Sequence, residues 1–337
     1  MSYSSLKRRK KQSIGLTMAS FATLVKSILN RLSPCDYPVL NSQLFFKIWL
    51  TYVLDQGLTS MRALFYRLNH AGITVDMSTF SKANKTRTTS LFEGIYTQLM
   101  SQAQKRHRTS SMTLFPIDST IITLTSKLFW FYKYHQVKLL TGFDLIENIM
   151  GKAVISFGER HDLSFQEEIL EMIPENAVVI MDRGFASWQF LERLSERKCS
   201  FVVRIKNNMR MKLNHERYRV VQFFDENQTE FRIATNLKEL SDEEVSELYR
   251  QRWAIENLWK FLKMHLSLDK LITKSLNGVI NQIYMVLIAY LILELVEIPE
   301  YFGKKLLDKL RYLQLELSRR CSIVHWSFDW QPELLVT

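Results

Sequence analysis

Two aspartates each follow a short apolar run that has the pattern of a β-strand. Asp118 comes after residues 114–117, and Asp182 comes after residues 177–181. A carboxylate at the end of a buried strand is costly to desolvate unless it is paired or binds a metal, and Mg²⁺ prefers oxygen ligands. A turn residue or a helix cap is the alternative for either aspartate alone. The presence of two in the same setting favours a site for a divalent cation.

A further group of polar side chains is expected on a helix that covers residues 249–263. At about 100° per residue, four of its side chains project within about 60° of one another, namely those of Tyr249, Arg252, Glu256 and Lys263. A solvated face with an Arg–Glu pair is the alternative for an isolated helix. Beside the two aspartates, Glu256 completes a set of three carboxylates that can hold two Mg²⁺ ions, and Arg252 and Lys263 can bind phosphates. This combination indicates phosphodiester chemistry.

The first third of the chain is predicted to be helical, without strands, over residues 13–105. Two short helices joined by a turn at Ala71-Gly72 are expected near residues 59–88. This spacing suits a helix-turn-helix, whose second helix lies in the DNA major groove, and an ordinary helical bundle is the alternative. The second helix carries three basic residues, Lys82, Lys85 and Arg87.

The remainder is predicted to be α/β with a mixed sheet, because short β-rich runs begin near Met112 and amphipathic helices separate the later ones. Residues 207–238 have the pattern of a hairpin inserted before the next helix. Ser241 and Glu244 form a capping box that starts a long helix. The helices after Lys274 are expected to cover the sheet, and a dimer contact is the alternative.

The charge is concentrated at the N-terminal end. The chain of 337 residues has a net charge of +11, and residues 1–110 hold 16 Lys and Arg against 4 Asp and Glu. A flexible basic arm is predicted for residues 1–12. A concentrated positive field attracts nucleic acid through its phosphates, and a merely soluble basic surface is the alternative.

Cysteine usage and hydropathy exclude other classes of protein. The 3 cysteines, Cys35, Cys199 and Cys321, are far apart, so neither a disulfide framework nor a thiolate zinc site is expected and a reducing cytoplasm fits best. The uncharged stretch 277–293 is interrupted by polar residues and is interpreted as a core helix rather than a membrane span.

These residues resemble the DDE transposases of bacterial insertion sequences, of the insertion-sequence-4 type, whose helix signature is Y-x2-R-x3-E-x6-K. The four residues of the stripe from Tyr249 to Lys263 fit that spacing, residues 182–185 are similar to the D-x-G-F strand end, and Asp118 matches the first aspartate. Residues 137–141 and 159–162 also resemble family segments, and the resemblance covers about residues 75–290.

The resemblance implies an RNase H-like catalytic core, a mixed sheet flanked by helices, over residues 110–290. It implies a β insertion at about 207–238, an all-α DNA-binding region over 13–105 and a C-terminal helical tail over 291–337.

The implied function is cut-and-paste transposition: binding of the element's terminal inverted repeats, then metal-dependent strand cleavage and strand transfer. Asp118, Asp182 and Glu256 would bind two Mg²⁺ ions, for which Mn²⁺ can substitute. The residues expected to bind DNA are Tyr249, Arg252, Lys263, Arg183 and Lys206 near the scissile phosphate, and Lys82, Lys85 and Arg87 in the N-terminal region.

The expected partners are double-stranded DNA, as transposon ends and as target, and a second copy of the chain in a homodimer on that DNA. No membrane and no small-molecule substrate is expected, and the place of action is the bacterial cytoplasm at the nucleoid. The alternatives are an inactive or domesticated DNA-binding protein and an RNase H-like nuclease without strand transfer.

Three features depart from the family pattern or extend it. Leu140 stands where many relatives have His, which is neutral because that position is not one of the three acidic ligands. Residues 207–238 contain no Trp to stabilise a flipped base, so Tyr218, Phe223 or Phe224 would have to supply the stacking, with packing beneath the hairpin as the alternative. His161 and Asp162 either touch the site or form a loop turn.

Overall fold

The structure is a computed structural model that describes residues 21–32, 37, 39–106, 113–125, 128, 130, 132–209, 217–224 and 227–318. The chain forms two compact units. Residues 1–101 and 262–337 make one, called here the helical unit, and residues 102–261 make the other, called the sheet unit. The predicted basic arm, Cys35, Cys321 and residues 319–337 of the predicted tail lie outside the described residues.

The helical unit contains helices from both ends of the chain. Its elements are α2 (Ser42–Leu54), α3 (Met61–His70), α4 (Met77–Thr86), most of α5 (Ser90–Arg106), α11 (Leu276–Leu295), η3 (Glu300–Phe302) and α12 (Leu306–Ser318). The helix–turn–helix pair predicted near 59–88 corresponds to α3 and α4. Ser60 caps α3, and Gly72 takes the left-handed conformation in the turn that follows. The Phe80 ring of α4 packs against the rings of Phe45, Trp49 and Phe65.

Helix α11 is the apolar helix of this unit. It packs on α2 and α4 and also contacts α12, all of which are helices of its own unit, whereas the sequence led us to expect that this run covers the sheet. Within the described part of the chain it is long and apolar enough to span a membrane, but 83% of its apolar window is buried inside the protein, as in a core helix. The buried Gln282 explains one polar interruption: its amide donates to the carbonyls of Ser267 and Lys270 and accepts from the N–H of Ile272.

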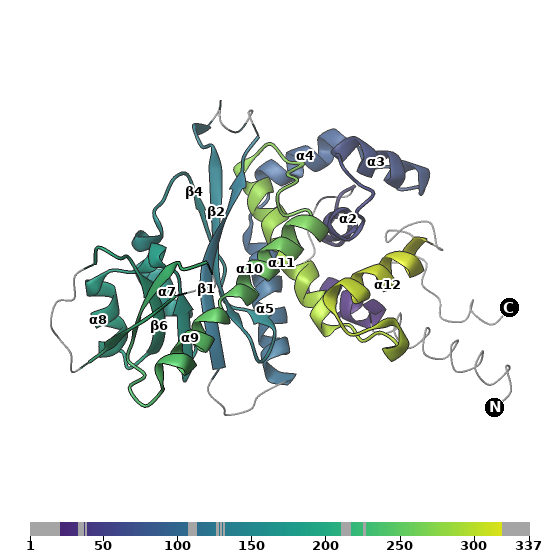
Figure 1. Ribbon diagram of the computed structural model, residues 1–337. Helices are drawn as coiled ribbons and strands as arrows, with labels where there is room; N and C mark the ends of the chain where they lie inside the picture. The colour runs from purple at the N-terminus through teal and green to yellow at the C-terminus, as the bar shows by residue number, and fades with distance from the viewer. Residues whose placement is uncertain are drawn as a thin grey trace, which may run out of the picture. The chain divides into compact units, whose positions relative to one another are not determined.

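The sheet unit is built on one mixed sheet with the order β3-β2-β1-β5-β6-β8-β7, and β4 pairs with β2 (Figure 1). Its strands are β1 (Thr113–Thr123), β2 (Gln136–Asp144), β3 (Ile149–Met150), β4 (Val154–Phe157), β5 (Ala177–Met181), β6 (Ser200–Ile205), β7 (Arg219–Phe224) and β8 (Glu230–Thr235). Its helices are η1 (Asp162–Phe165), α7 (Gln166–Met172), η2 (Arg183–Phe185), α8 (Trp188–Glu196), α9 (Asp242–Arg250) and most of α10 (Trp253–His265). Strands β1, β5 and β6 are parallel, and β2 runs antiparallel to β1.

Helices cover both faces of the central strands, as the continuous apolar pattern of β5 predicts. Val179 and Met181 face α7 and α8 in one apolar cluster, whereas Val178 and Ile180 face α9 in the other. The buried, rigid strand therefore carries Asp182 at its end.

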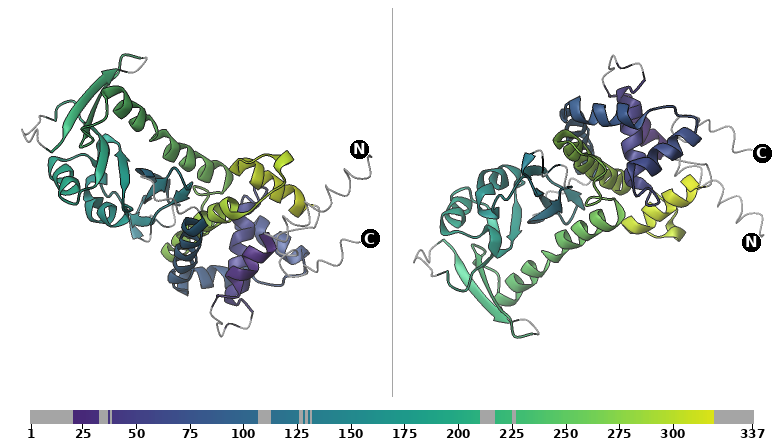
Figure 2. Two further views of the ribbon diagram at one scale, coloured as in Figure 1. Left: turned by 90° about the horizontal axis from the view of Figure 1, so that it is seen from below. Right: turned by 90° about the horizontal axis from the view of Figure 1, so that it is seen from above.

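The predicted hairpin of residues 207–238 extends the main sheet. Strand β8 pairs with both β6 and β7, and the hairpin lies beside α9 (Figure 2). Tyr218 is buried and stacks on Trp188, and Phe223 stacks on Phe231, so both pack within the protein, whereas Phe224 is exposed.

The predicted long helix is in fact two helices. The capping box of Ser241 and Glu244 starts α9 as expected. The chain then turns at Gln251 and Arg252, whose N–H groups bond three residues back rather than four, and α10 begins at Trp253. The expected single helix is therefore divided, with Tyr249 in α9 and Glu256 and Lys263 in α10. Arg252 in the turn still lies near both the Tyr249 ring and Glu256.

The close approach of β1 and β2 explains why a glycine stands at position 142. The Phe115 ring of β1 lies over Gly142 of β2, where a Cβ atom would come within 2.0 Å of the ring. We predict that Gly142→Ala lowers the free energy of unfolding by about 1–3 kcal/mol, because the buried ring has to move. Urea denaturation measures this change.

The matched control is Gly94→Ala in α5, where a Cβ atom meets nothing within 4 Å. That substitution should raise stability by up to about 1 kcal/mol, since it removes a glycine from a helix interior. Equal stability of Gly142→Ala and the wild type would contradict the packing described here.

Candidate active site

Asp118 and Asp182 lie on two neighbouring strands, just beyond the point where the pairing of β1 with β5 ends: Asp118 is in the middle of β1, and Asp182 follows the last residue of β5. The parallel pairing of β1 with β5 places Ile117 opposite Met181, and each aspartate is the next residue. Paired residues of parallel strands point to the same face of the sheet, so the two carboxylates share a face of the sheet. The prediction that Asp182 follows a buried strand is confirmed, because β5 ends at Met181. The same prediction for Asp118 is wrong, because β1 continues to Thr123 and Asp118 pairs with Thr141 of β2.

Asp118 is largely removed from water. Burial raises its pKa to about 6, although the Ser119 N–H and the charge of Arg252 oppose the shift, and the negative charge of Glu256 adds to it. The indole Nε1–H of the buried Trp259 in α10 donates to Oδ2 of Asp118 at 3.2 Å. A buried carboxylate with a raised pKa and a second carboxylate nearby is typical of a functional site.

Asp182 is held by residues from α9 and β6. The Tyr249 hydroxyl donates to Oδ1 at 3.0 Å, and Nη1 of Arg204 lies 3.7 Å from the same oxygen. Burial and the neighbouring charge of Asp182 raise the pKa of Tyr249, so its hydroxyl remains a donor. The Arg204 guanidinium lies over the Phe231 ring, 4.1 Å from its centroid.

Glu256 pairs with Arg252 one turn away, with 2.5 Å between Oε1 and Nη2. Burial favours the neutral form of Arg252, but Tyr249, Glu256 and Asp182 outweigh it and raise the pKa of Arg252. Arg252 therefore acts as the shared positive charge among the three carboxylates.

The donor set suits a hard divalent cation, since it consists of carboxylate oxygens from β1, the end of β5 and α10. In the described part of the chain, no group of three or more His, Cys, Asp or Glu side chains is gathered closely enough to hold a metal ion as it stands. The Glu256 carboxylate is instead paired with Arg252.

The other basic residues proposed from the sequence are placed in different settings. Arg183 and Lys206 are exposed, directly after β5 and β6. Lys263 lies farther along α10, beyond Phe261, where the sheet unit ends. Lys82 and Lys85 are exposed on α4, whereas the Arg87 guanidinium lies against the rings of Tyr37 and Phe45 and donates to the Leu40 carbonyl. Arg87 is thus engaged within the protein, and DNA contact by the others stays a prediction.

Arg204 and Trp259 are parts of the site that the sequence analysis missed. Arg204 is the charged residue in the otherwise apolar run of β6, where an arginine is costly unless it has a partner. Trp259 follows Glu256 by three residues, which puts both on one face of α10. The charged residue within β6 and the three-residue spacing from Glu256 are the two sequence signals that point to these side chains.

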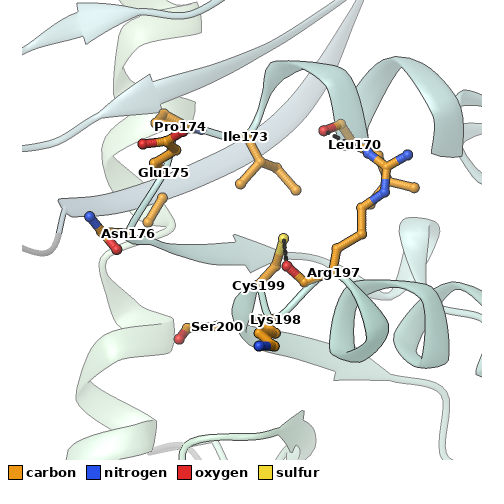
Figure 3. A pocket seen from close by; sticks show the side chains of 10 residues that line it. Leu170, Ile173, Pro174, Glu175, Asn176, Arg197, Lys198, Cys199 and Ser200 are labelled. Atoms are coloured by element: carbon orange, nitrogen blue, oxygen red, sulfur yellow. Dashed lines mark hydrogen bonds between the residues drawn. The ribbon is translucent and has the colours of Figure 1, made fainter.

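A separate pocket of about 740 Å³ lies at the opposite edge of the sheet, where β5 and β6 begin (Figure 3). Arg197, Lys198 and Cys199 line it on the β6 side. Burial raises the pKa of the Cys199 thiol, and Arg197 donates to the Leu170 carbonyl. The five residues of β5 separate this pocket from Asp182, so it takes no part in the carboxylate site.

Comparison with known proteins agrees with this geometry. Residues 109–292 match the family described as transposase DDE domain. The chain is 45% identical, over 92% of its length and 98% of the relative's, to the protein assigned as transposase for insertion sequence element IS4SA in Synechocystis sp.. It is 27% identical, over 64% of its length and 66% of the relative's, to the one assigned to insertion sequence element IS5377 in Geobacillus stearothermophilus.

A solved structure supports the fold. The piggyBac transposase in a synaptic complex with hairpin DNA superposes with a TM-score of 0.52 at 11% identity, covering 86% of this chain and 73% of that one. At this identity the match concerns the fold alone, which is the RNase H-like arrangement expected from the sequence.

The role of Arg252 leads to a stability prediction. Arg252→Met leaves the partly buried Glu256 without its partner and removes the shared positive charge, so the free energy of unfolding should fall by about 1–2 kcal/mol in metal-free buffer. Thermal and urea denaturation measure this loss.

The control is Arg250→Met, two residues away. Arg250 pairs with Glu247 at 3.0 Å, and both side chains are more than half exposed, so the change should stay within about 0.5 kcal/mol. Equal losses in the two variants would show that Arg252 has no special electrostatic role.

Proposed function

The chain belongs to the DDE transposase family, and we propose that it excises and inserts its own DNA element by cleaving and rejoining strands at the carboxylate site. The observation that carries this proposal is the pairing of Ile117 with Met181, which puts Asp118 and Asp182 next to each other, with Glu256 close enough to affect the charge of Asp118. The family depends on divalent metal ions.

Asp118, Asp182 and Glu256 would hold the ions, which we propose to be two Mg²⁺ with Mn²⁺ as a substitute. When bound, such ions activate the attacking oxygen and stabilise the leaving oxygen of an in-line displacement. Tyr249 and Arg204 orient Asp182, and Trp259 orients Asp118. Arg252, released from Glu256, is placed to bind the scissile phosphate, and Arg183, Lys206 and Lys263 are further candidates for the same strand.

Two displacements at phosphorus account for the cleavage and joining of the transferred strand at each end of the element. In the first, a water oxygen forms a bond to the scissile phosphorus, the bond from phosphorus to the 3′ oxygen breaks, and that oxygen takes up a proton. In the second, the freed 3′-hydroxyl loses its proton and attacks a phosphorus of target DNA, which releases a 3′-hydroxyl of the target. Each bond formed replaces one bond broken, so strand transfer needs no outside energy source.

The N-terminal region is proposed to recognise the terminal inverted repeats. Its 16 basic residues within positions 1–110 supply the field, and Lys82 and Lys85 are exposed on α4, the second helix of the α3–α4 pair. Because two transposon ends are cut together, we propose a homodimer on DNA. The proposed place of action is the bacterial nucleoid.

Cleavage and joining are expected to require Glu256. Glu256→Gln keeps the side-chain volume but removes one carboxylate charge, so Mg²⁺-dependent cleavage and strand transfer on DNA carrying the element's ends should fall by at least 100-fold. DNA binding in a gel-shift assay should persist. Glu247→Gln, at an exposed position of α9, is the control and should retain activity.

The outcomes separate the alternatives. Cleavage without joined products would indicate a nuclease, and DNA binding without metal-dependent products in the wild type would indicate a regulator or an inactive copy. Full activity of Glu256→Gln would refute the assignment of the site.

DNA binding by α4 has its own test. Replacing Lys82 and Lys85 together with Gln should weaken binding to the element's ends and lower the slope of log affinity against log salt by about 2, since each phosphate contact contributes about 0.9. Lys304→Gln, at a strongly exposed position of the same unit, is the control. An unchanged slope in the double variant would exclude α4 from the phosphate contacts.

A further inference from the structure

Asp162 contacts the two chain segments that present the site aspartates. It begins η1, after β4, and its Oδ1 accepts hydrogen bonds from Ser119 Oγ at 2.9 Å and from Lys138 Nζ at 2.9 Å. Its Oδ2 faces Gly184, where an added Cβ atom would lie 2.9 Å from that oxygen. Ser119 directly follows Asp118, and Gly184 is two residues after Asp182.

The Asp182 segment needs such a support. The pairing of β1 with β5 ends at Ile117 and Met181, so neither aspartate is fixed to the other by the sheet's hydrogen bonds. Asp182 has extended backbone geometry at the start of η2, and its side chain makes no capping bond there. A contact just beyond the last pair of β1 and β5 is therefore suited to fix the spacing of the two carboxylates.

Lys138 neutralises Asp162, so that Asp162 can contact both segments without adding a fourth negative charge to the site. Its side chain is only 9% exposed, and Asp162 is the carboxylate that it pairs with. The ammonium also lies 5.9 Å from the centroid of the Phe165 ring. In this partly buried ion pair, Lys138 and Asp162 compensate each other's charge. Asp162 can therefore accept the hydrogen bond of Ser119 without adding an uncompensated negative charge.

We propose that Asp162 is a positioning residue for the transposase site: through Ser119 and the turn at Gly184 it sets the spacing of Asp118 and Asp182, and Lys138 holds it in place. The inference rests on the proposed function, because it concerns the carboxylates that would bind metal. The side chains that support metal ligands typically affect affinity or activity by about 10–100-fold when they are removed.

The experiment compares Asp162→Ala and Ser119→Ala with Glu171→Ala, which breaks the exposed Lys152–Glu171 ion pair of the same unit. Two readouts are taken on the full chain well below the unfolding temperature. One is the dissociation constant for Mn²⁺ without DNA, followed by electron paramagnetic resonance of the free ion. The other is the kcat and KM for cleavage of the element's ends.

For Asp162→Ala we expect the Mn²⁺ dissociation constant to rise and kcat to fall by about 10–100-fold each, with an unchanged KM for DNA. Ser119→Ala keeps the Lys138–Asp162 pair and so the fold, and should show a smaller change in the same direction. Glu171→Ala should match the wild type. A lower unfolding temperature with unchanged Mn²⁺ affinity and kcat in both variants would show a merely structural ion pair and would overturn the inference.

If Asp162→Ala does not fold, Ser119→Ala and Gly184→Ala serve as the test variants, since the added methyl group of Gly184→Ala presses against Asp162 from the other side.

Two further results distinguish a failure of the inference from a failure of the proposed function. If the wild type neither binds Mn²⁺ nor cleaves, the proposed function fails. If the wild type does both and the variants equal it, only the positioning role fails.

Discussion

Repulsion among three carboxylates is the constraint on which the surroundings of the site depend. Asp118 and Asp182 are adjacent because of the strand register, and the charge of Glu256 contributes to the raised pKa of Asp118. Like charges this close in a partly buried setting are unfavourable unless donors and a counter-charge surround them. The indole of Trp259, the hydroxyl of Tyr249 and the guanidinium of Arg252 have these roles.

The need to compensate these negative charges also accounts for two irregular features of the fold, the turn between α9 and α10 and the charged side chains within strands. With the 3₁₀ turn between α9 and α10, Tyr249 donates to Asp182 while Trp259 donates to Asp118 in the neighbouring strand β1. An arginine in the apolar strand β6 and a lysine in β2 each pair with an aspartate at the edge of the sheet. Under the proposed function, divalent ions would take over from Arg252 as the counter-charge of Glu256.

Much of this could be predicted from the sequence, because it depends on local patterns. The apolar run of β5, the capping box at Ser241 and the spacing from Tyr249 to Lys263 led to the sheet, the start of α9 and the family. What could not be predicted depends on tertiary contacts. The break at Gln251 contains neither Pro nor Gly, and α11 has an apolar surface all round, which does not reveal whether it packs on a sheet or on other helices.

The proposed function requires Asp118, Asp182 and Glu256 to form one metal-binding site. The decisive measurement is anomalous scattering from crystals of the protein grown with Mn²⁺ and a transposon-end duplex. We expect manganese peaks bound by these three carboxylates, with the Arg252 side chain moved away from Glu256. Manganese bound at other carboxylates, with Arg252 still paired to Glu256 in crystals that retain cleavage activity, would contradict it.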